Sequence, residues 1–317
     1  MVGAIALQYC PVIRYRHQMS PLLVKLLTVA ILIPSLGACD SRARCPKAPQ
    51  TRSPKLAHCL APRQRVIDLT QLMQEGMPVG PGGVPFKMTR VVDYDQGYRM
   101  HKLEMGENVG THVDAPAHFA EGKRTIDQIP VDELVVPAVM IDVRDKVKDN
   151  PDYLVCANDV VDWEAVHGPV PVGSLVIANT GWHKRFVDPE KYLNQDSQGV
   201  MHFPGIAPEA AQLLVERDVM GIGIDTLSLD AGAAQEFATH RIMLAANTVQ
   251  IENLSNLDAL PEVGATVIIG VLPLANGTQA QARIIALVPE LEAPDDEAPE
   301  AGALSVAGSG FQGAAIR

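Results

Sequence analysis

Two histidines and one aspartate stand at short spacing in one stretch of the chain, and these side chain types are suited to metal chemistry. They are His112, Asp114 and His118, in the pattern His-x-Asp-x-Pro-x-His. Alternate residues of an extended chain share one face, so the three can converge on one point. Imidazole and carboxylate together suit divalent zinc, manganese or iron. Pro116 ends any strand pairing there, which lets His118 turn toward a substrate.

An exposed polar strand is the alternative explanation for the same three residues. The neighbouring positions are apolar, and one face of the segment must therefore be buried: Val113, Ala115, Ala117 and Phe119. The other face then holds three potential ligands. The spacing alone leaves both explanations open.

Further candidate ligands lie downstream, at His240 and in the run Gln250-Ile251-Glu252. Gln250 and Glu252 would share one face of a strand, and either could complete a site of three protein ligands with one open position. The simpler alternative is that Glu252 lies at the protein surface and binds no metal. The group Asp225-Thr226-x-Ser228-x-Asp230 follows a buried strand, where it could line a site or cap a turn.

Short apolar runs between turn residues predict the elements that position these groups. Strands are expected over 65–69, 134–143, 174–178, 220–224, 265–274 and 281–288. Residues 207–217 predict an amphipathic helix with Pro208 in its first turn, 159–165 a shorter helix, and 240–247 an undecided segment. His183 lies in a polar loop and is expected at the surface. Strands outnumber helices without regular alternation, which predicts a mixed α/β fold, partly barrel-like, with flanking helices.

The composition limits the possible partners, and the two ends of the chain differ in composition from the predicted folded domain. The formal net charge of -11 argues against nucleic acid as a partner. Two common nucleotide-binding glycine motifs are absent from the sequence. Residues 1–39 predict a signal peptide that ends in the lipoprotein-like box Leu36-Gly37-Ala38-Cys39, although an ordinary signal peptide explains the same run. Residues 40–65 predict a flexible tether, 66–288 the folded domain, and 289–317 a disordered acidic tail. These features predict an exported protein, periplasmic or held to a membrane by lipid at Cys39.

The segments described so far resemble the metal-dependent cyclase family, which includes bacterial kynurenine formamidases and isatin hydrolases. The family signature reads His-x-Gly-Thr-His-x-Asp-x-Pro-x-His and corresponds to residues 108–118. Other similar segments follow in order across nearly the whole folded region: Ile67-Asp68-Leu69-Thr70, Met77-Pro78, Asn179-Thr180-Gly181-Trp182, His202-Phe203-Pro204-Gly205, Gly223-Ile224-Asp225-Thr226-x-Ser228-x-Asp230 and Ile251-Glu252-Asn253-Leu254.

The resemblance implies a swivelling β/β/α fold that assembles as a homo-oligomer, with a divalent metal, Mn or Zn. It implies that His112 and Asp114 bind the metal and that His118 is the general acid/base. It also matches His240 and Glu252 to the pair that completes the formamidase site. Gln250 rivals Glu252 as third ligand, because an amide joins the metal shell in the isatin hydrolases.

Two departures from the family pattern bear on the substrate. Asn108 stands where the signature has its first histidine, and an amide is a weaker ligand, which disfavours a second metal. Gly80 stands where formamidases tend to place tryptophan, which changes the shape of the pocket.

The expected function is metal-dependent hydrolysis of a small cyclic or aromatic amide, as in isatin hydrolases. Water activated by the metal would attack the carbonyl, and His118 would relay protons with His240 near the oxyanion. Phe119 and Trp182 could stack on the substrate, and His202 is a pocket residue or a loop anchor. A formamidase is the first alternative, and a ligand-binding lipoprotein without turnover is the second.

Overall fold

The computed structural model describes residues 64–290, and the elements named here lie in that range. The strands are β1 (Gln64–Asp68), β2 (Lys87–Val92), β3 (Met100–Glu104), β4 (His112–Asp114), β5 (Val135–Asp142), β6 (Leu154–Val155), β7 (Leu175–Asn179), β8 (Gly205–Ile206), β9 (Gly221–Ile224), β10 (Val249–Glu252), β11 (Ala265–Val271) and β12 (Gln279–Pro289). The α-helices are α1 (Arg144–Val147), α2 (Ala157–His167), α3 (Pro189–Leu193), α4 (Pro208–Glu216) and α5 (Ala238–Ala245).

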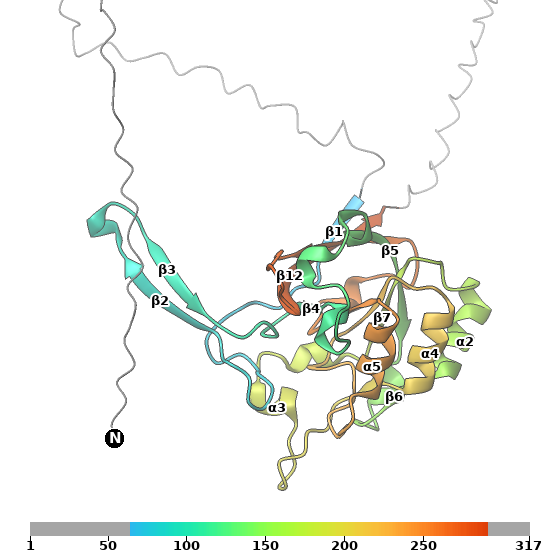
Figure 1. Ribbon diagram of the computed structural model, residues 1–317. Helices are drawn as coiled ribbons and strands as arrows, with labels where there is room; N and C mark the ends of the chain where they lie inside the picture. The colour runs from blue at the N-terminus through green and yellow to red at the C-terminus, as the bar shows by residue number, and fades with distance from the viewer. Residues whose placement is uncertain (1–63, 291–317) are drawn as a thin grey trace, which may run out of the picture. The chain divides into compact units, whose positions relative to one another are not determined.

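Eight strands form one sheet in the order β1-β12-β11-β5-β7-β9-β10-β4. The short strand β4 also pairs with β12, and this second pairing closes the sheet on itself (Figure 1). The predicted mixed α/β, partly barrel-like fold is therefore confirmed. The closure matters for function because it places β4, which begins at His112 and ends at Asp114, between β10 and β12.

The central strands have two buried faces, and each face packs into its own core. In β7, Leu175 and Ile177 pack in one cluster with Val113 and Ile251, while Val176 packs in the other. A parallel strand covered on both faces is an unbroken apolar run, and this pattern predicts β7 and β9, whereas the β-branched residues of 134–143 predict β5.

Helices α2, α4 and α5 contribute to the second core. Trp163 of α2, Leu214 of α4 and Met243 of α5 are buried together with Val176 and Ile222 of the sheet. Each fully buried side chain of this size contributes about 1.5–3 kcal/mol relative to exposure. Helix α4 begins at Pro208 as predicted, and the undecided segment after His240 is the C-terminal part of α5.

The β2–β3 hairpin is absent from the sequence prediction, as are the short elements β6, β8, α1 and α3. Strands β2 and β3 pair with each other in a separate two-stranded hairpin, with Met88 opposite Leu103 and Lys87 opposite Glu104. Most of its side chains are exposed, because only Val92 and His101 of the two strands are partly covered.

The predicted signal peptide, most of the tether and almost all of the acidic tail lie outside the described residues. Among the helices within residues 64–290, none is long and apolar enough to cross a membrane.

Candidate active site

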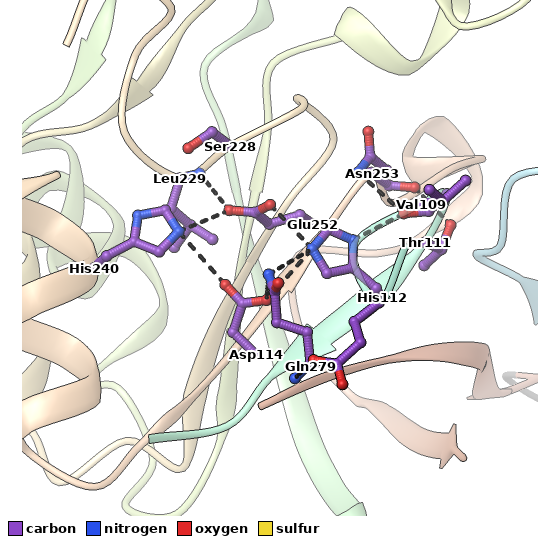
Figure 2. A network of polar contacts seen from close by, with 12 residues as sticks. Val109, Thr111, His112, Asp114, Ser228, Leu229, His240, Glu252, Asn253 and Gln279 are labelled. Atoms are coloured by element: carbon purple, nitrogen blue, oxygen red, sulfur yellow. Dashed lines mark hydrogen bonds and ion pairs between the residues drawn. The ribbon is translucent and has the colours of Figure 1, made fainter. Parts of the chain in front are cut away.

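The register of three neighbouring strands sets polar side chains in two rows on one face of the sheet. In one row Asp114 of β4 lies between Gln250 of β10 and Gln279 of β12. In the next row His112 lies between Glu252 and Gln281. Residues that face each other across paired strands share a face. The two rows therefore bring one imidazole, two carboxylates and three amides together. Figure 2 shows four of these side chains, His112, Asp114, Glu252 and Gln279.

The opposite face of the same three strands is apolar. Val113 lies between Ile251 and Ala280, and all three are fully buried in the core inside the closed sheet. A shift of β4 by one residue would exchange the two faces, at the cost of burying two charged groups in an aliphatic core. The alternation of polar and apolar residues in β4 thus fixes its register with β10 and β12. This register places His112 and Asp114 beside the polar residues of the neighbouring strands.

Two imidazoles and two carboxylates contact each other within this cluster. Nε2 of His112 lies 3.3 Å from an oxygen of Asp114 and 3.3 Å from an oxygen of Glu252. Nε2 of His240 lies 3.4 Å from the other oxygen of Asp114 and 3.1 Å from the other oxygen of Glu252. His112, Asp114 and Glu252 are buried and offer ligand atoms that all lie within 4.8 Å of one another.

A divalent cation fits this cluster. Oδ2 of Asp114 and Oε1 of Gln250 are buried without a hydrogen-bond donor, although buried polar atoms are nearly always paired. Two buried carboxylates need positive charge nearby, and nitrogen and carboxylate oxygen suit zinc or manganese. The donor set therefore favours Glu252 as the third ligand and leaves Gln250 adjacent to it.

The two imidazoles supply positive charge beside the two carboxylates. Burial alone would lower the pKa of His112, but hydrogen bonds to Asp114 and Glu252 raise it to about 10. Burial likewise opposes protonation of His240, while Asp114, Asp230 and Glu252 raise its pKa to about 12. Burial would raise the pKa of the Asp114 carboxyl, but the two histidines hold it far below its ordinary value.

A polar network at the start of β4 fixes the ring of His112. Its Nδ1 lies 2.9 Å from the carbonyl oxygen of Gly110, whose φ of +71° favours glycine. The Thr111 hydroxyl donates to the backbone carbonyl oxygen of Asn253 at 2.7 Å and accepts from the backbone N–H of Gln71 at 2.8 Å. Donation from Nδ1 to Gly110 leaves Nε2 free to bind a cation.

His240 is fixed from the N-terminal turn of α5. Asp230 accepts the backbone N–H groups of Thr239 and His240 at 3.0 and 3.2 Å and the His240 Nδ1 at 2.5 Å. Glu252 is held in turn by the backbone N–H of Leu229 at 3.0 Å. The 225–230 group thus has two roles, because Asp230 serves the site whereas Asp225 binds Thr180 and His183 in a neighbouring loop.

His118 lies at the edge of the cluster. It ends the short 3-10 helix Pro116–His118 and its ring centroid is 6.3 Å from that of His240. Its partial burial lowers the pKa of His118 below the ordinary value, against the attraction of the Asp114 carboxylate. A neutral imidazole beside a charged cluster is suited to accept and return a proton.

A cavity of about 350 Å³ opens onto the cluster. Four residues of the cluster and its edge line this cavity: His118, His240, Glu252 and Gln279. Its other walls include Gly80, Pro81, Asn108, Phe119, Met201, Phe203, Leu227 and Phe237. The rings of Phe119 and Phe237 lie 5.7 Å apart and each approaches His240, at 4.9 and 5.7 Å. An apolar cavity with a few convergent polar groups is typical of a small-molecule site.

Two of the predicted substrate contacts lie elsewhere. Trp182 is 1% exposed and packs in the second core, where its Nε1 donates to the Tyr192 carbonyl at 2.8 Å. His202 turns outward to Asp152, with its Nδ1 at 2.8 Å from the carboxylate, so it is a loop anchor. Phe119 does line the cavity, as predicted. His202 does not line it, but the residues before and after it, Met201 and Phe203, do.

Two residues of the site were absent from the sequence prediction. Gln279 donates to Asp114 at 2.8 Å and lies 3.5 Å from Nε2 of His112, but only the closure of β4 onto β12 brings it there. Phe237 adopts φ +50°, which is rare for a bulky residue, and this turn directs α5 toward the cluster. Neither residue belongs to a short motif that could have indicated its role.

Comparison with known proteins relates the chain to hydrolases. A family model described as a putative cyclase matches residues 67–231. An isatin hydrolase from Roseibium aggregatum is 31% identical over 252 residues, which are 74% of this chain and 95% of that protein. A kynurenine formamidase from Geobacillus thermodenitrificans is 32% identical over 177 residues, which are 55% of this chain and 74% of that protein.

Solved structures agree with the sequence relatives. An isatin hydrolase bound to the product analogue thioisatinate superposes with a TM-score of 0.69 at 30% identity, over 72% of this chain and 93% of that one. A potential metal-dependent hydrolase with cyclase activity superposes with a TM-score of 0.56 at 26% identity, over 72% of this chain and all of that one (100%).

Proposed function

The chain belongs to the cyclase family and is a metal-dependent amide hydrolase, and we propose that its substrate is a small lactam fused to an aromatic ring, as in isatin. The single observation that supports this proposal best is the pair of polar rows across β10, β4 and β12 beside a cavity with aromatic walls. The rows offer a cation site, His118 can carry a proton, and Phe119 and Phe237 give the cavity an aromatic wall.

The proposed metal ligands are His112, Asp114 and Glu252, with manganese or zinc as the ion. One imidazole and two carboxylates form a harder donor set than the cysteine-rich sites that select zinc alone. Gln250 and Gln279 flank Asp114 in its row, and rotation of either amide would present a carbonyl oxygen to the ion. When bound, the divalent ion polarises the substrate carbonyl and makes water a stronger nucleophile at neutral pH.

In the proposed reaction water adds to the lactam carbonyl carbon, and the bond between this carbon and nitrogen breaks. His118 accepts a proton from the attacking water and returns it to the departing nitrogen, so the ring opens to an amine and a carboxylic acid, which loses its remaining proton to solvent and becomes a carboxylate. The lowered pKa of His118 keeps its imidazole neutral and ready to accept that proton at pH 7.

His240 has the position of an electrostatic partner in this reaction. Its Nδ1 is taken by Asp230, so its Nε2 points to the carboxylates of Asp114 and Glu252 at the cavity wall. A proton on Nε2 would favour the negative oxygen that forms when water attacks the carbonyl.

Phe119 and Phe237 support an aromatic substrate. Their rings lie on the cavity side of His240, and the guanidinium of Arg241 lies 5.4 Å from the Phe119 ring centroid. Aromatic rings contribute about 0.5–1.5 kcal/mol by stacking on a flat ligand, beyond the area they bury.

A direct assay tests this function. The purified chain, loaded with manganese or zinc, is incubated with isatin and ring opening is followed by the change in absorbance. Turnover that is lost in the Asp114→Asn variant is the expected result. An absence of turnover with either metal, in protein shown to contain one ion per chain, would disprove the isatin proposal.

Hydrolysis of N-formylkynurenine is the second candidate function. Glu252 and His240 lie with His112 and Asp114, as the resemblance to formamidases implies, and a formamidase is 32% identical to part of the chain. Asn108 and Gly80 line the cavity in place of the histidine and tryptophan expected of a formamidase, which favours the lactam. The same protein assayed on both substrates discriminates between the two functions.

We also retain export, lipid attachment at Cys39 and homo-oligomeric assembly as proposals. Cys39 lies outside the described residues, and its support is the apolar run that precedes it. The relatives are hydrolases by name, so a binding role without turnover has no support beyond the lipoprotein-like box.

A further inference from the structure

Asn253, the residue that follows β10, has a partner for each of its polar groups. Its backbone N–H donates to the Thr226 carbonyl at 2.9 Å, and its own carbonyl accepts from the Thr111 hydroxyl at 2.7 Å. Its side-chain Nδ2 donates to the Gly110 carbonyl at 3.0 Å, and its Oδ1 accepts from the Tyr192 hydroxyl at 2.8 Å. The residue is 1% exposed, so these contacts are made inside the protein and not with bulk water.

The Gly110 carbonyl connects Asn253 to the first proposed metal ligand. This oxygen lies 2.9 Å from Nδ1 of His112 and 3.0 Å from Nδ2 of Asn253. A carbonyl oxygen has two lone pairs, so the two donors use both of them. In Figure 2 Asn253 lies on the side of the His112 ring opposite His240. The Asn253 amide therefore holds the oxygen that binds the ring nitrogen directed away from the cluster.

Only one orientation of the Asn253 amide satisfies its surroundings. The Gly110 carbonyl can accept but cannot donate, so it must face Nδ2. The Tyr192 hydroxyl can donate, and its one proton lies between Oδ1 of Asn253 at 2.8 Å and the Asp225 carbonyl at 3.0 Å. Burial raises the pKa of the Tyr192 hydroxyl well above its ordinary value, which keeps this proton in place. Tyr192, fully buried in α3, thus holds the amide toward Gly110.

Backbone conformation is the simpler explanation for an asparagine at this position. Asn253 has φ +57°, a left-handed conformation that glycine and asparagine adopt more readily than other residues. Asn256 has φ +53°, and its Nδ2 likewise donates to a backbone carbonyl, that of Asp68 at 2.7 Å. This explanation predicts that glycine serves equally well at both positions. However, only the carbonyl bound by Asn253 also binds a proposed metal ligand, His112.

From these contacts we propose that Asn253 is a positioning residue for His112, and that Tyr192 supports it. The amide holds the Gly110 carbonyl where it accepts from Nδ1, which keeps the proton on Nδ1 and the lone pair of Nε2 directed to the cation. Groups that orient a metal ligand in this way are typically worth about 10- to 100-fold in metal affinity. The inference rests on the proposed ligation by His112, and it concerns affinity for the ion, whichever amide is the substrate.

The test compares the zinc affinity of two glycine variants with that of the unmodified full-length protein by calorimetric titration. Asn253→Gly keeps the backbone conformation and removes only the side chain, so its affinity should fall by about tenfold, the lower end for a supporting group. Asn256→Gly is the matched control, and its affinity should not change. Unchanged affinity in Asn253→Gly, or an equal loss in both variants, would overturn the inference alone. An unmodified protein that binds no zinc would overturn the proposed ligand set as well.

The histidine rings provide a readout that a general loss of packing would not move selectively. Nitrogen NMR of the zinc-loaded protein, labelled in its histidines, follows the proton on Nδ1 of His112. This proton should exchange with water about tenfold faster in Asn253→Gly, because its bond to Gly110 opens more often. The proton on Nδ1 of His240 is held by Asp230 and should exchange at the same rate in both proteins. Unchanged exchange at His112, or faster exchange at both rings, would contradict the inference.

A second substitution keeps the inference testable if Asn253→Gly does not fold. Tyr192→Phe removes only the hydroxyl that orients the amide and retains the buried ring. Its zinc affinity should fall by about 2- to 12-fold, as expected for one neutral hydrogen bond. The control Tyr153→Phe loses a hydroxyl bonded to Asp159 at 2.8 Å and should bind zinc as the unmodified protein does. Unchanged affinity in Tyr192→Phe would contradict the inference.

Discussion

Oδ2 of Asp230 lies 2.5 Å from Nδ1 of His240, and this contact decides which ring nitrogen faces the cavity. The same carboxylate accepts two backbone N–H groups at the start of α5, so the ring and its helix are held by one group. His240 Nε2 is thereby directed to Asp114 and Glu252. The site therefore depends on a residue that does not itself contact the proposed metal ligands.

Replacement of Asp230 by asparagine should slow catalysis without removing the metal. The amide cannot accept from the ring and both backbone groups as the carboxylate does, so His240 loses its fixed orientation. A group that orients an active-site histidine is typically worth about 10- to 100-fold in activity. Steady-state kinetics and metal content of Asp230→Asn are compared with those of Asp162→Asn, a control in the exposed part of α2. Unchanged kcat/KM in Asp230→Asn would contradict the role.

Substitution of Glu252 should weaken metal binding more than substitution of Gln250. Glu252→Gln removes one of the three clustered ligands, so its affinity for manganese or zinc should fall by more than about 100-fold, which is the upper end for a supporting group. Gln250→Ala should retain most of its affinity, because Gln250 is adjacent to the cluster. Isothermal titration with both variants measures the difference. The reverse order of affinities would make Gln250 the third ligand.

The proposed role of His118 as a base predicts that kcat/KM declines at a lower pH than it would with an ordinary histidine. His118 acts as a base and must be neutral, and burial lowers its pKa below 6.5. The kcat/KM should therefore stay level as the pH falls through 6.5 and decline only at lower pH. His118→Ala should lose about 10²- to 10⁴-fold in kcat with its metal content unchanged. A profile that declines above pH 6.5, or an active His118→Ala, would rule out this role.

The sequence was sufficient to predict that His112 and Asp114 lie on one face of a strand, and insufficient to predict how the sheet closes. Alternation around Val113 indicated that His112 and Asp114 share a face, because pairing has a period of two residues. That Gln279 joins their row depends on the pairing of β4 with β12, between segments that no local pattern connects. His183, expected at the surface, is 9% exposed because the Asp225 carboxylate accepts from its Nδ1 at 2.9 Å.

The aromatic wall can be tested at Phe237. Its φ of +50° strains a bulky residue by about 1–2 kcal/mol, and glycine adopts the same conformation without strain. Phe237→Gly should therefore keep its melting temperature while its KM for an aromatic lactam rises about 2- to 12-fold, the equivalent of 0.5–1.5 kcal/mol of stacking. Phe186→Gly, a fully buried control outside the cavity, should lose stability instead. An unchanged KM in Phe237→Gly would exclude the ring from substrate binding.

Removal of the metal should leave a protein whose stability depends on pH in a definite direction. In the ion-free chain the pKa values of His112 and His240 are raised to about 10 and 12, from about 6.5 in an unfolded chain. A raised pKa means that the folded state binds more protons, so this stabilisation is complete below pH 6.5 and is lost as the pH rises toward 10. The melting temperature of the stripped protein should therefore fall between pH 6.5 and 10.

The metal-loaded protein should resist this loss, because the cation replaces the proton on Nε2 of His112 as a charge that offsets Asp114 and Glu252. Free ion at 100 times its dissociation constant adds about 2.7 kcal/mol of stability, and the dissociation constant itself decreases as the pH rises and fewer protons compete. The difference in melting temperature between loaded and stripped protein should thus widen from pH 6.5 to pH 9. Calorimetry of both forms measures it, and Asp114→Asn should show no difference between them. A gap that narrows with pH would mean that the ion does not compete with a proton at His112, and the proposed ligand set would be wrong.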